Sequence, residues 1–347
     1  MSRGNVWRPI RRSALCFEVN RTKNRGKRKR MSLCIAATCL DGDDPKIVMC
    51  TDWRAEFPAI GSHENADKLS FIKDGWPVLL AGEGPSEEAL VSVYQQELKS
   101  AELNQDNIYN QLKGPMHKRK AILADDFTRQ ALGIPYEEFL VKGKATFPDE
   151  FFRQHIEQVE GIRLGTSLII CGFIDTYDYI EKKPERSSVI AVVDDEAPTD
   201  KIFSMQTDFA AIGSGYASAL GVLCRRGQSS DDPLLRTIYV LYEAKMLSDR
   251  VPGVSESALS IDVLSADGTM QSLSDEGYKV CDKLFGRFGP RTIKDDNERH
   301  QIKFKMESKY LEPFIKAFLE DSEKRKKLSS STNQPTSDPS SGHSQPS

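Results

Sequence analysis

The chain has 347 residues, of which 39% are hydrophobic and 29% charged, and its formal net charge is −3. This is the composition of an ordinary soluble protein, and no apolar run reaches the roughly 18 residues of a membrane span. Seven cysteines without CxxC pairs and five dispersed histidines argue against a disulfide framework and metal catalysis. We therefore expect a cytoplasmic protein with no cofactor, no metal and no membrane partner.

Basic residues concentrate at the N-terminus. Residues 1–30 carry eleven Lys and Arg against one acid, Glu18, which leaves 37 basic and 50 acidic residues in the remainder. The acidic remainder disfavours nucleic acid as a partner. We interpret residues 1–31 as a basic extension, with a propeptide, a targeting address or a mis-assigned start as the open explanations.

From Ser32 the pattern changes to short strands. SLCIAATCL and KIVMCTDWR, joined by the turn residues DGDDP, predict a hairpin, and KLSFIKDG with PVLLAGEG predicts a second one. A helix is predicted over PSEEALVSVYQQELKSAEL (85–103), with Pro85 near its start and Glu87 in its first turn. Residues from about 100 to 160 are polar with helical periodicity and predict a helical insertion.

Strands return after the insertion. The predicted strands are GTSLIICGFID, SSVIAVVDD, KIFSM, DFAAIG, SALSIDVLSADG and TMQSL, and the predicted helices are YASALGVLCRRG, PLLRTIYVLYEAKMLSDR and residues 275–285. This order predicts one α+β domain over 32–290, with two packed sheets and outer helices. A charged segment with a C-terminal helix is predicted over 291–327, followed by a disordered tail over 328–347.

The chain supplies, in order, the groups that an N-terminal hydroxyl nucleophile requires. If Ser32 were the first residue, its own α-amine, with an ordinary pKa of about 8, would act as the base. A cation that tunes this amine, a carboxylate that holds the cation and a backbone oxyanion donor complete the set. Lys68, Asp52 and Gly82 are the candidates for these three roles.

These residues resemble the proteasome β-subunit group of N-terminal nucleophile (Ntn) hydrolases, including bacterial proteasome-like proteins. The matching motifs are Asp52-Trp53-Arg54, Lys68-Leu69 and Leu80-Ala81-Gly82. The intervals of 16 residues from Asp52 to Lys68 and 14 from Lys68 to Gly82 agree with the family without gaps. The interval of 20 from Ser32 to Asp52 is longer than usual by about one hairpin extension, which DGDDP can accommodate.

The resemblance resumes at LIICGFID and AAIGSGYASALGVL, so that it covers roughly 32–114 and 165–273. It implies that Ser214 lies beside the terminal amine. It also implies that Asp249 and Ser255 in LSDRVPGVSES correspond to the family's Asp-x-x-Ser element, although their separation is wider.

The resemblance implies a four-layer αββα sandwich and a proteasome-like endopeptidase with Ser32 as nucleophile. The resemblance further implies peptide or protein substrates and a homo-oligomeric ring or stacked assembly, with an unfoldase as a candidate partner. Activity requires Ser32 as the mature N-terminus, freed by translation from Met31 or by cleavage of the Met31–Ser32 bond.

Two alternative functions stay open: a non-catalytic structural or interaction subunit, and an Ntn amidase for a small-molecule amide. A nucleotide-binding enzyme is disfavoured by two incomplete motifs. GSGYAS at 213–218 lacks the third Gly or Ala of a dinucleotide fingerprint, and GEGPS at 82–86 lacks the GK[ST] of a phosphate loop.

Overall fold

The structure, a computed structural model, describes residues 33–52, 55–57, 61–63, 68–82, 84–178, 183–194, 203–249 and 259–289. These residues form two five-stranded antiparallel sheets, a small two-stranded sheet and seven helices, so the predicted α+β class is confirmed. Ser32, Ser255, the basic extension, the expected C-terminal helix and the tail lie outside the described residues. None of the helices in the described part has the length and apolar character of a membrane-crossing segment.

The first sheet has the strand order β10-β1-β2-β11-β12. Its strands are β1 (Leu33–Asp41), β2 (Asp44–Asp52), β10 (Phe209–Gly213), β11 (Leu259–Ser265) and β12 (Met270–Ser272). The predicted first hairpin is confirmed by the pairing of β1 with β2, whose register closes at Asp41 and Asp44. Gly42 has a φ of 66° in the connecting turn, which is a backbone conformation that glycine adopts without strain.

The second sheet has the strand order β5-β6-β7-β8-β9. Its strands are β5 (Leu69–Lys73), β6 (Trp76–Gly82), β7 (Thr166–Asp178), β8 (Lys183–Val193) and β9 (Phe203–Gln206). The predicted second hairpin is confirmed by the pairing of β5 with β6. Strands β3 (Ala55–Phe57) and β4 (Gly61–His63) form the separate two-stranded sheet.

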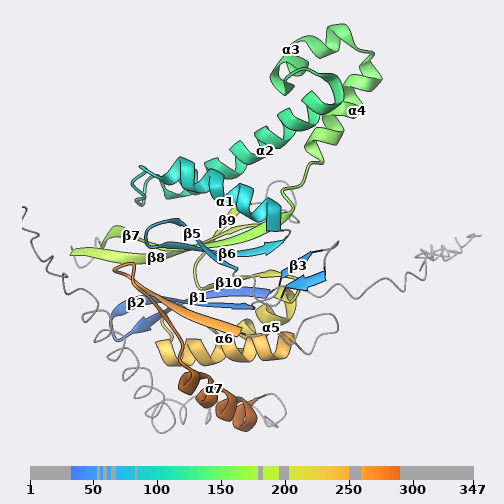
Figure 1. Cartoon of the computed structure of the whole chain (residues 1–347). Helices are drawn as coiled ribbons and strands as arrows, with labels where there is room; N and C mark the ends of the chain where they lie inside the picture. The colour runs from blue at the N-terminus through green and yellow to red at the C-terminus, as the bar shows by residue number, and fades with distance from the viewer. Residues whose placement is uncertain are drawn as a thin grey trace, which may run out of the picture.

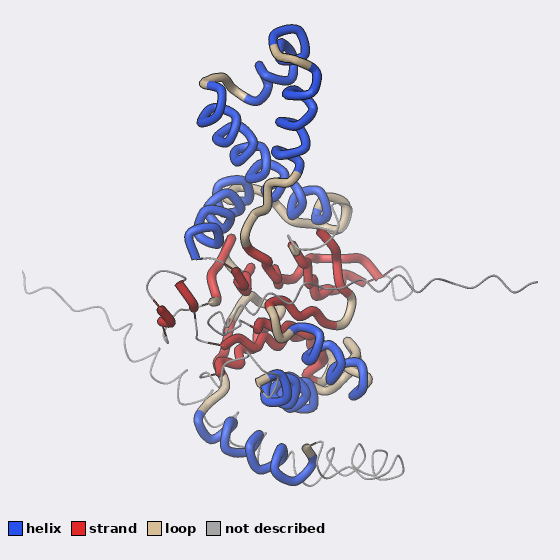
Figure 2. Tube along the Cα trace, turned by 90° about the vertical axis from the view of Figure 1, so that its right-hand side faces the viewer, coloured by secondary structure: helices blue, strands red, loops and turns tan. Residues whose placement is uncertain are grey.

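The two large sheets pack face to face, with helices on both outer sides (Figures 1 and 2). Side chains alternate along β1, so that Cys34 and Ala36 join the core between the sheets, while Leu33 and Ile35 face the helices. The helices on the first sheet are α5 (Tyr216–Arg226), α6 (Leu234–Ser248) and α7 (Asp275–Phe288), and α1 (Gly84–Leu98) covers the second sheet. Because β1 is covered on both faces, every residue from Leu33 to Cys39 is buried.

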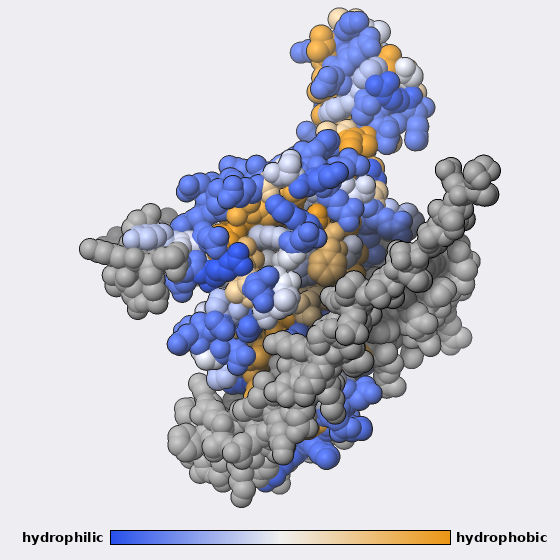
Figure 3. Space-filling model, turned by 60° about the vertical axis from the view of Figure 1, so that its left-hand side comes forward, coloured by the Kyte–Doolittle hydropathy of each residue, from blue (hydrophilic) through white to orange (hydrophobic). Residues whose placement is uncertain are grey.

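The helices predicted over about 100–160 are present, and they project away from the sheets (Figure 1). They are α2 (Ile108–Leu132), α3 (Tyr136–Thr146) and α4 (Asp149–Glu160), here called the helical projection. Phe139 is fully buried there and packs against Phe147, Phe152 and His155. Apolar side chains also appear among the polar ones on the surface of the projection (Figure 3), and Val141 is 81% exposed.

Helix α1 ends at Leu98, five residues before its predicted end. The Ala101 N–H donates to the Leu98 carbonyl at 3.2 Å, and the Ala101 carbonyl accepts a hydrogen bond from the Lys73 ammonium. Asn104 and Asn107 then hydrogen-bond to nearby backbone groups in a turn before α2. These local contacts compete with the helical hydrogen bonds and end the helix early.

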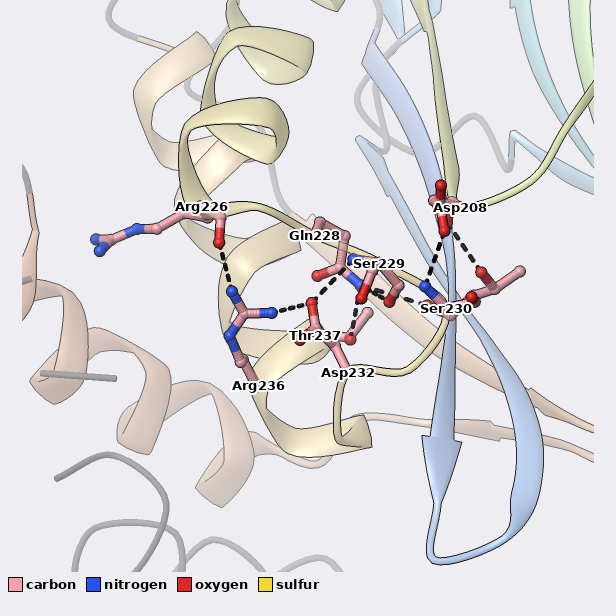
Figure 4. A network of polar contacts seen from close by, with 9 residues as sticks. Asp208, Arg226, Gln228, Ser229, Ser230, Asp232, Arg236 and Thr237 are labelled. Carbon is pink, nitrogen blue, oxygen red and sulfur yellow. Dashed lines mark hydrogen bonds and ion pairs between the residues drawn. The ribbon is translucent and has the colours of Figure 1, made fainter. Parts of the chain in front are cut away.

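A polar network fastens the connection between α5 and α6 to the first sheet (Figure 4). The Ser230 N–H donates to Asp208 at 2.9 Å, and the Gln228 amide donates to the Thr237 hydroxyl at 3.0 Å. The Asp232 carbonyl accepts from the Leu40 N–H of β1 at 3.0 Å. The start of α6 is therefore fixed relative to β1, which in turn positions the far end of α6.

Candidate active site

Asp52 is the last residue of β2 and is fully buried. It lies at the open end of the β1–β2 hairpin, beside the start of β1. Its Oδ2 accepts a hydrogen bond from the Leu33 N–H at 3.0 Å, and its Oδ1 forms an ion pair with the Lys68 ammonium. A buried carboxylate is costly unless it is paired and hydrogen-bonded, and Asp52 has both kinds of partner. The carboxylate therefore links the first described residue of β1 to a cation from the second sheet.

Lys68 immediately precedes β5 and its side chain is only 4% exposed. The Lys68 carbonyl accepts a hydrogen bond from the Leu80 N–H of β6 at 2.9 Å. This contact places Lys68 beside Leu80 of β6, which precedes Gly82 by two residues. Lys68 therefore lies at the end of the second sheet that faces Asp52. Asp52 and Lys68, which the resemblance implies act as a pair, are thus in direct contact.

Burial raises the pKa of Asp52 above its ordinary value of 3.8, and the nearby charges of Lys68 and Lys245 oppose this rise. Burial likewise raises the pKa of Glu87, in the first turn of α1, and the charge of Lys68 again opposes the rise. Lys68 is therefore within electrostatic reach of two carboxyl groups. A cation held in this way lowers the proton affinity of any amine placed beside it.

Gly82 is the exposed last residue of β6 and pairs with Thr166 of β7. A Cβ at Gly82 would lie 2.6 Å from the Gly165 carbonyl oxygen and 2.6 Å from the Thr166 Cα. Only glycine fits this close approach of two backbones. The predicted oxyanion residue is thus an exposed residue at a strand end, and α1 begins two residues later at Gly84.

Ser214 and Asp249 lie at the ends of two elements beside Leu33. Leu33 pairs with Gly213 of β10, and Ser214 is the exposed residue that follows. Asp249 follows the last turn of α6 and forms an ion pair with Lys245. The structure therefore places both residues near the start of β1.

The ends of α5 and α6 meet at the same place. The Ser248 hydroxyl lies 3.4 Å from the Gly215 carbonyl oxygen, to which it donates. A Cβ at Gly215 would lie 3.4 Å from both Leu33 Cδ atoms and from the Ser248 Cβ. The turn that contains Ser214 is thus packed against Leu33 and against the C-terminal end of α6.

Sequence reasoning missed Lys245, which lies in the predicted helix PLLRTIYVLYEAKMLSDR. Its side chain is fully buried, and its charge acts on Asp52. A signal was present, because Lys245 follows Ile238 by seven residues and Leu241 by four and so lies on the apolar face of α6. Glu87 was noted only as a helix-start residue.

Cys34 is the thiol nearest to these groups in the described part of β1. Its Sγ donates to the Leu80 carbonyl at 3.2 Å, and its side chain is fully buried between the sheets. Burial raises the pKa of Cys34 far above the ordinary thiol value, which disfavours the reactive thiolate. Cys34 is therefore a packing residue of the core.

The arrangement can stabilise a negative charge and tune a base at the start of β1.

No protein-family model matches the chain, and no curated protein matches its sequence. Function is therefore inferred from the residues around Asp52 and from their geometry.

Proposed function

We propose that the chain is a proteasome-like Ntn hydrolase that cleaves peptide or protein amide bonds with Ser32 as nucleophile. Two face-to-face sheets with helices on both outer sides support the four-layer αββα sandwich that the resemblance implies. The buried ion pair at the start of β1 supports the catalytic assignment.

One observation carries the proposal: the Asp52 carboxylate binds the Leu33 N–H and the Lys68 ammonium at the same time. Ser32 is covalently joined to the Leu33 nitrogen, and consecutive Cα atoms are about 3.8 Å apart. The nucleophile is thus attached directly to the backbone group that the carboxylate holds. The geometry favours a role for the ion pair at residue 32.

The proposed reaction begins when the Ser32 Oγ attacks the carbonyl carbon of the substrate and the Ser32 α-amine accepts the hydroxyl proton. The charge of Lys68 lowers the proton affinity of this amine, so that more of it is neutral and able to act as base. The Gly82 N–H donates to the oxyanion of the tetrahedral intermediate.

Collapse of the intermediate breaks the C–N bond, and the leaving nitrogen takes the proton from the Ser32 ammonium. The acyl group remains as an ester on Ser32 Oγ. Water then attacks the ester, with the α-amine again acting as base, and releases the carboxylic acid and free Ser32.

The direct test compares two chains that differ by one residue. One begins at Ser32, released from a cleavable fusion, and the other retains Met31 in front of it. We expect hydrolysis of peptide and small amide reporters by the first chain only, because only it has a free Ser32 amine. Equal activity of both chains would rule out the mechanism.

Ser32→Ala is expected to abolish hydrolysis in the chain that begins at residue 32. Lys118→Met is the control, because it changes a lysine that pairs with Glu97 on the exposed surface of the helices. It is expected to leave the rate unchanged. An inactive but folded Ser32 chain that co-purifies with a separate active subunit would favour the non-catalytic alternative instead.

The reporter panel also distinguishes a peptidase from a small-molecule amidase. Preference for peptides that extend on both sides of the cleaved bond is expected for the peptidase. Native mass spectrometry of the active chain tests the homo-oligomeric assembly that the resemblance implies.

A further inference from the structure

Lys245 is a buried cation for which the proposed reaction, as described above, has no role. It lies in the last turn of α6, its side chain is fully buried, and its ammonium forms an ion pair with Asp249 one turn later. Burying an ammonium costs several kcal/mol when it is moved out of water, and pairing recovers only part of this cost. An apolar residue in this position would pack more easily, so the lysine calls for an explanation.

Lys245 belongs to the helix that covers the outer face of the first sheet, and its charge acts on Asp52. Cys50 and Asp52 are two residues apart on β2 and therefore point to the same face. Cys50 belongs to the core cluster beneath α6, where Leu241 and Ala244 also pack. Helix α6 packs against β2, and the charge of Lys245 acts on both Cys50 and Asp52 at the end of that strand.

Asp52 is thus approached by two lysines from different layers. Lys68 reaches it from the second sheet and forms the direct ion pair, whereas Lys245 acts from α6. Among the described residues, these two lysines are the charged groups that lower the pKa of Asp52, and Lys245 in turn pairs with Asp249. From the second sheet to the end of α6, cations and carboxylates thus alternate in the order Lys68, Asp52, Lys245 and Asp249.

This alternation has a chemical consequence at the start of β1. Asp52 can hold the Lys68 ammonium only while it is ionised, and burial alone would favour its neutral form. A second cation on the far side of the carboxylate supports the ionised form without occupying the position of Lys68. Through its pair with Asp249, the same cation anchors the end of α6 that packs beside Gly215 and Leu33.

We propose that Lys245 is a positioning residue of the active site, which keeps Asp52 ionised from the helix side and thereby holds Lys68 in place beside residue 32. This role rests on the proposed function for its catalytic meaning. Its electrostatic part concerns the folded chain alone and can be measured without any substrate.

The experiment is an infrared pH titration of the Asp52 carboxyl band in the full chain, with the band identified by its loss in Asp52→Asn. Lys245→Met keeps a long side chain but removes the charge. We expect the titration midpoint of Asp52 to rise by about one pH unit or more, the size expected for loss of a nearby opposite charge. Lys245→Arg keeps the charge and is expected to hold the midpoint near that of the unmodified chain.

A matched control is available on the same helix. Glu243 is fully buried and pairs with Arg226 through two contacts of 2.7 Å, so Glu243→Gln also disturbs a buried ion pair of α6. It is expected to leave the Asp52 midpoint in place. The double variant Lys245→Met/Asp249→Asn removes the pair together and leaves neither charge without its partner, which covers the case that Lys245→Met does not fold.

An unchanged Asp52 midpoint in Lys245→Met and in the double variant would overturn the inference. In the chain that begins at Ser32, the acid limb of kcat/KM is expected to move to higher pH together with the midpoint, with little change in KM. If that chain hydrolyses nothing, the proposed function fails, while the infrared titration still decides whether Lys245 controls Asp52.

Discussion

The two-sheet body and the helical projection both bury polar side chains, but they do so differently. In the body, the carboxylate of Asp52 is buried with the ammonium groups of Lys68 and Lys245. In the projection, the buried His155 ring is 3.1 Å from the Thr128 hydroxyl and is surrounded by aromatic rings. Buried charges rarely stabilise a fold more than apolar packing would, so the body's cluster indicates function and the projection's contact indicates packing.

The first prediction concerns the buried ion pair of the body and has the largest expected effect. Lys68→Met leaves the Asp52 carboxylate buried without its direct partner, which costs about 3–5 kcal/mol of unfolding free energy. In the chain that begins at Ser32, we also expect the hydrolysis rate to fall by about 10³-fold, because the amine loses its tuning cation. Denaturant unfolding and kcat/KM measure the two effects.

A double variant separates these two losses. Asp52→Asn/Lys68→Met removes both charges, so its stability is expected to recover in part while its activity stays low. Recovery of activity together with stability would show that Lys68 matters only for folding.

The second prediction concerns the aromatic packing of the helical projection. Phe139→Ala removes a fully buried ring and is expected to cost about 3–5 kcal/mol of local stability, as for other buried Phe to Ala changes. Hydrogen exchange should speed up in α2, α3 and α4 and stay slow in β1 and β2. Val141→Ala, at a position 81% exposed, is the control and should change neither. Equal acceleration in both regions would show that they unfold as one unit.

The third prediction tests the strand end in the body. Gly82→Ala places a Cβ 2.6 Å from the Gly165 carbonyl oxygen, so the backbone at Gly82 has to move. We expect a fall in kcat of about 10²-fold through loss of the oxyanion donor, with KM little changed. Gly221→Ala, where a Cβ meets nothing within 4 Å, is the matched control in α5. Full activity of Gly82→Ala would remove Gly82 from the mechanism.

The fourth prediction uses pH and has the smallest expected effect. Burial lowers the pKa of His155 below its ordinary value of 6.5. The folded projection therefore binds fewer protons at His155 than the unfolded chain does, and its stability is complete above pH 6.5 and is lost as the pH falls through the folded pKa. Hydrogen exchange in α2 and α4 should accelerate on acidification.

In the body, Asp52 makes stability depend on pH in the opposite direction. Because its pKa is raised above 3.8, its contribution to stability is complete below that value and is lost as the pH rises through the folded pKa. His155→Phe should abolish the acid response of the projection and leave the response of the body intact. Acid sensitivity that persists in His155→Phe would assign it to another group, such as His117, whose pKa is also lowered.

Much of the body could be predicted from the sequence because its signals are local. The turn residues DGDDP between two apolar, β-prone segments predict the β1–β2 hairpin, and the family resemblance implies the pairing of Asp52 with Lys68. The early end of α1 could not be predicted, because it depends on Lys73 reaching the Ala101 carbonyl from a separate strand.

The burial of the Lys245 ammonium could not be predicted from the sequence either. Helical periodicity places it on the apolar face of α6, but a lysine there can bury its stem and still reach water with its charge. Only the packing of α6 on β2 shows that the ammonium is enclosed and that Asp249 and Asp52 lie near it. The expected roles of Ser32 and Ser255 stay predictions, because both residues lie outside the described part of the chain.

The central claim, that Ser32 is the nucleophile, is tested most directly by trapping the acyl-enzyme. The chain that begins at Ser32 is treated with an activated ester, quenched in acid and digested, and the acylated peptide is sequenced by mass spectrometry. The account predicts an ester on the Ser32 hydroxyl that forms in the unmodified chain and is absent from Ser32→Ala and from the chain that retains Met31. Acylation at another residue, or equal labelling of all three chains, would contradict it.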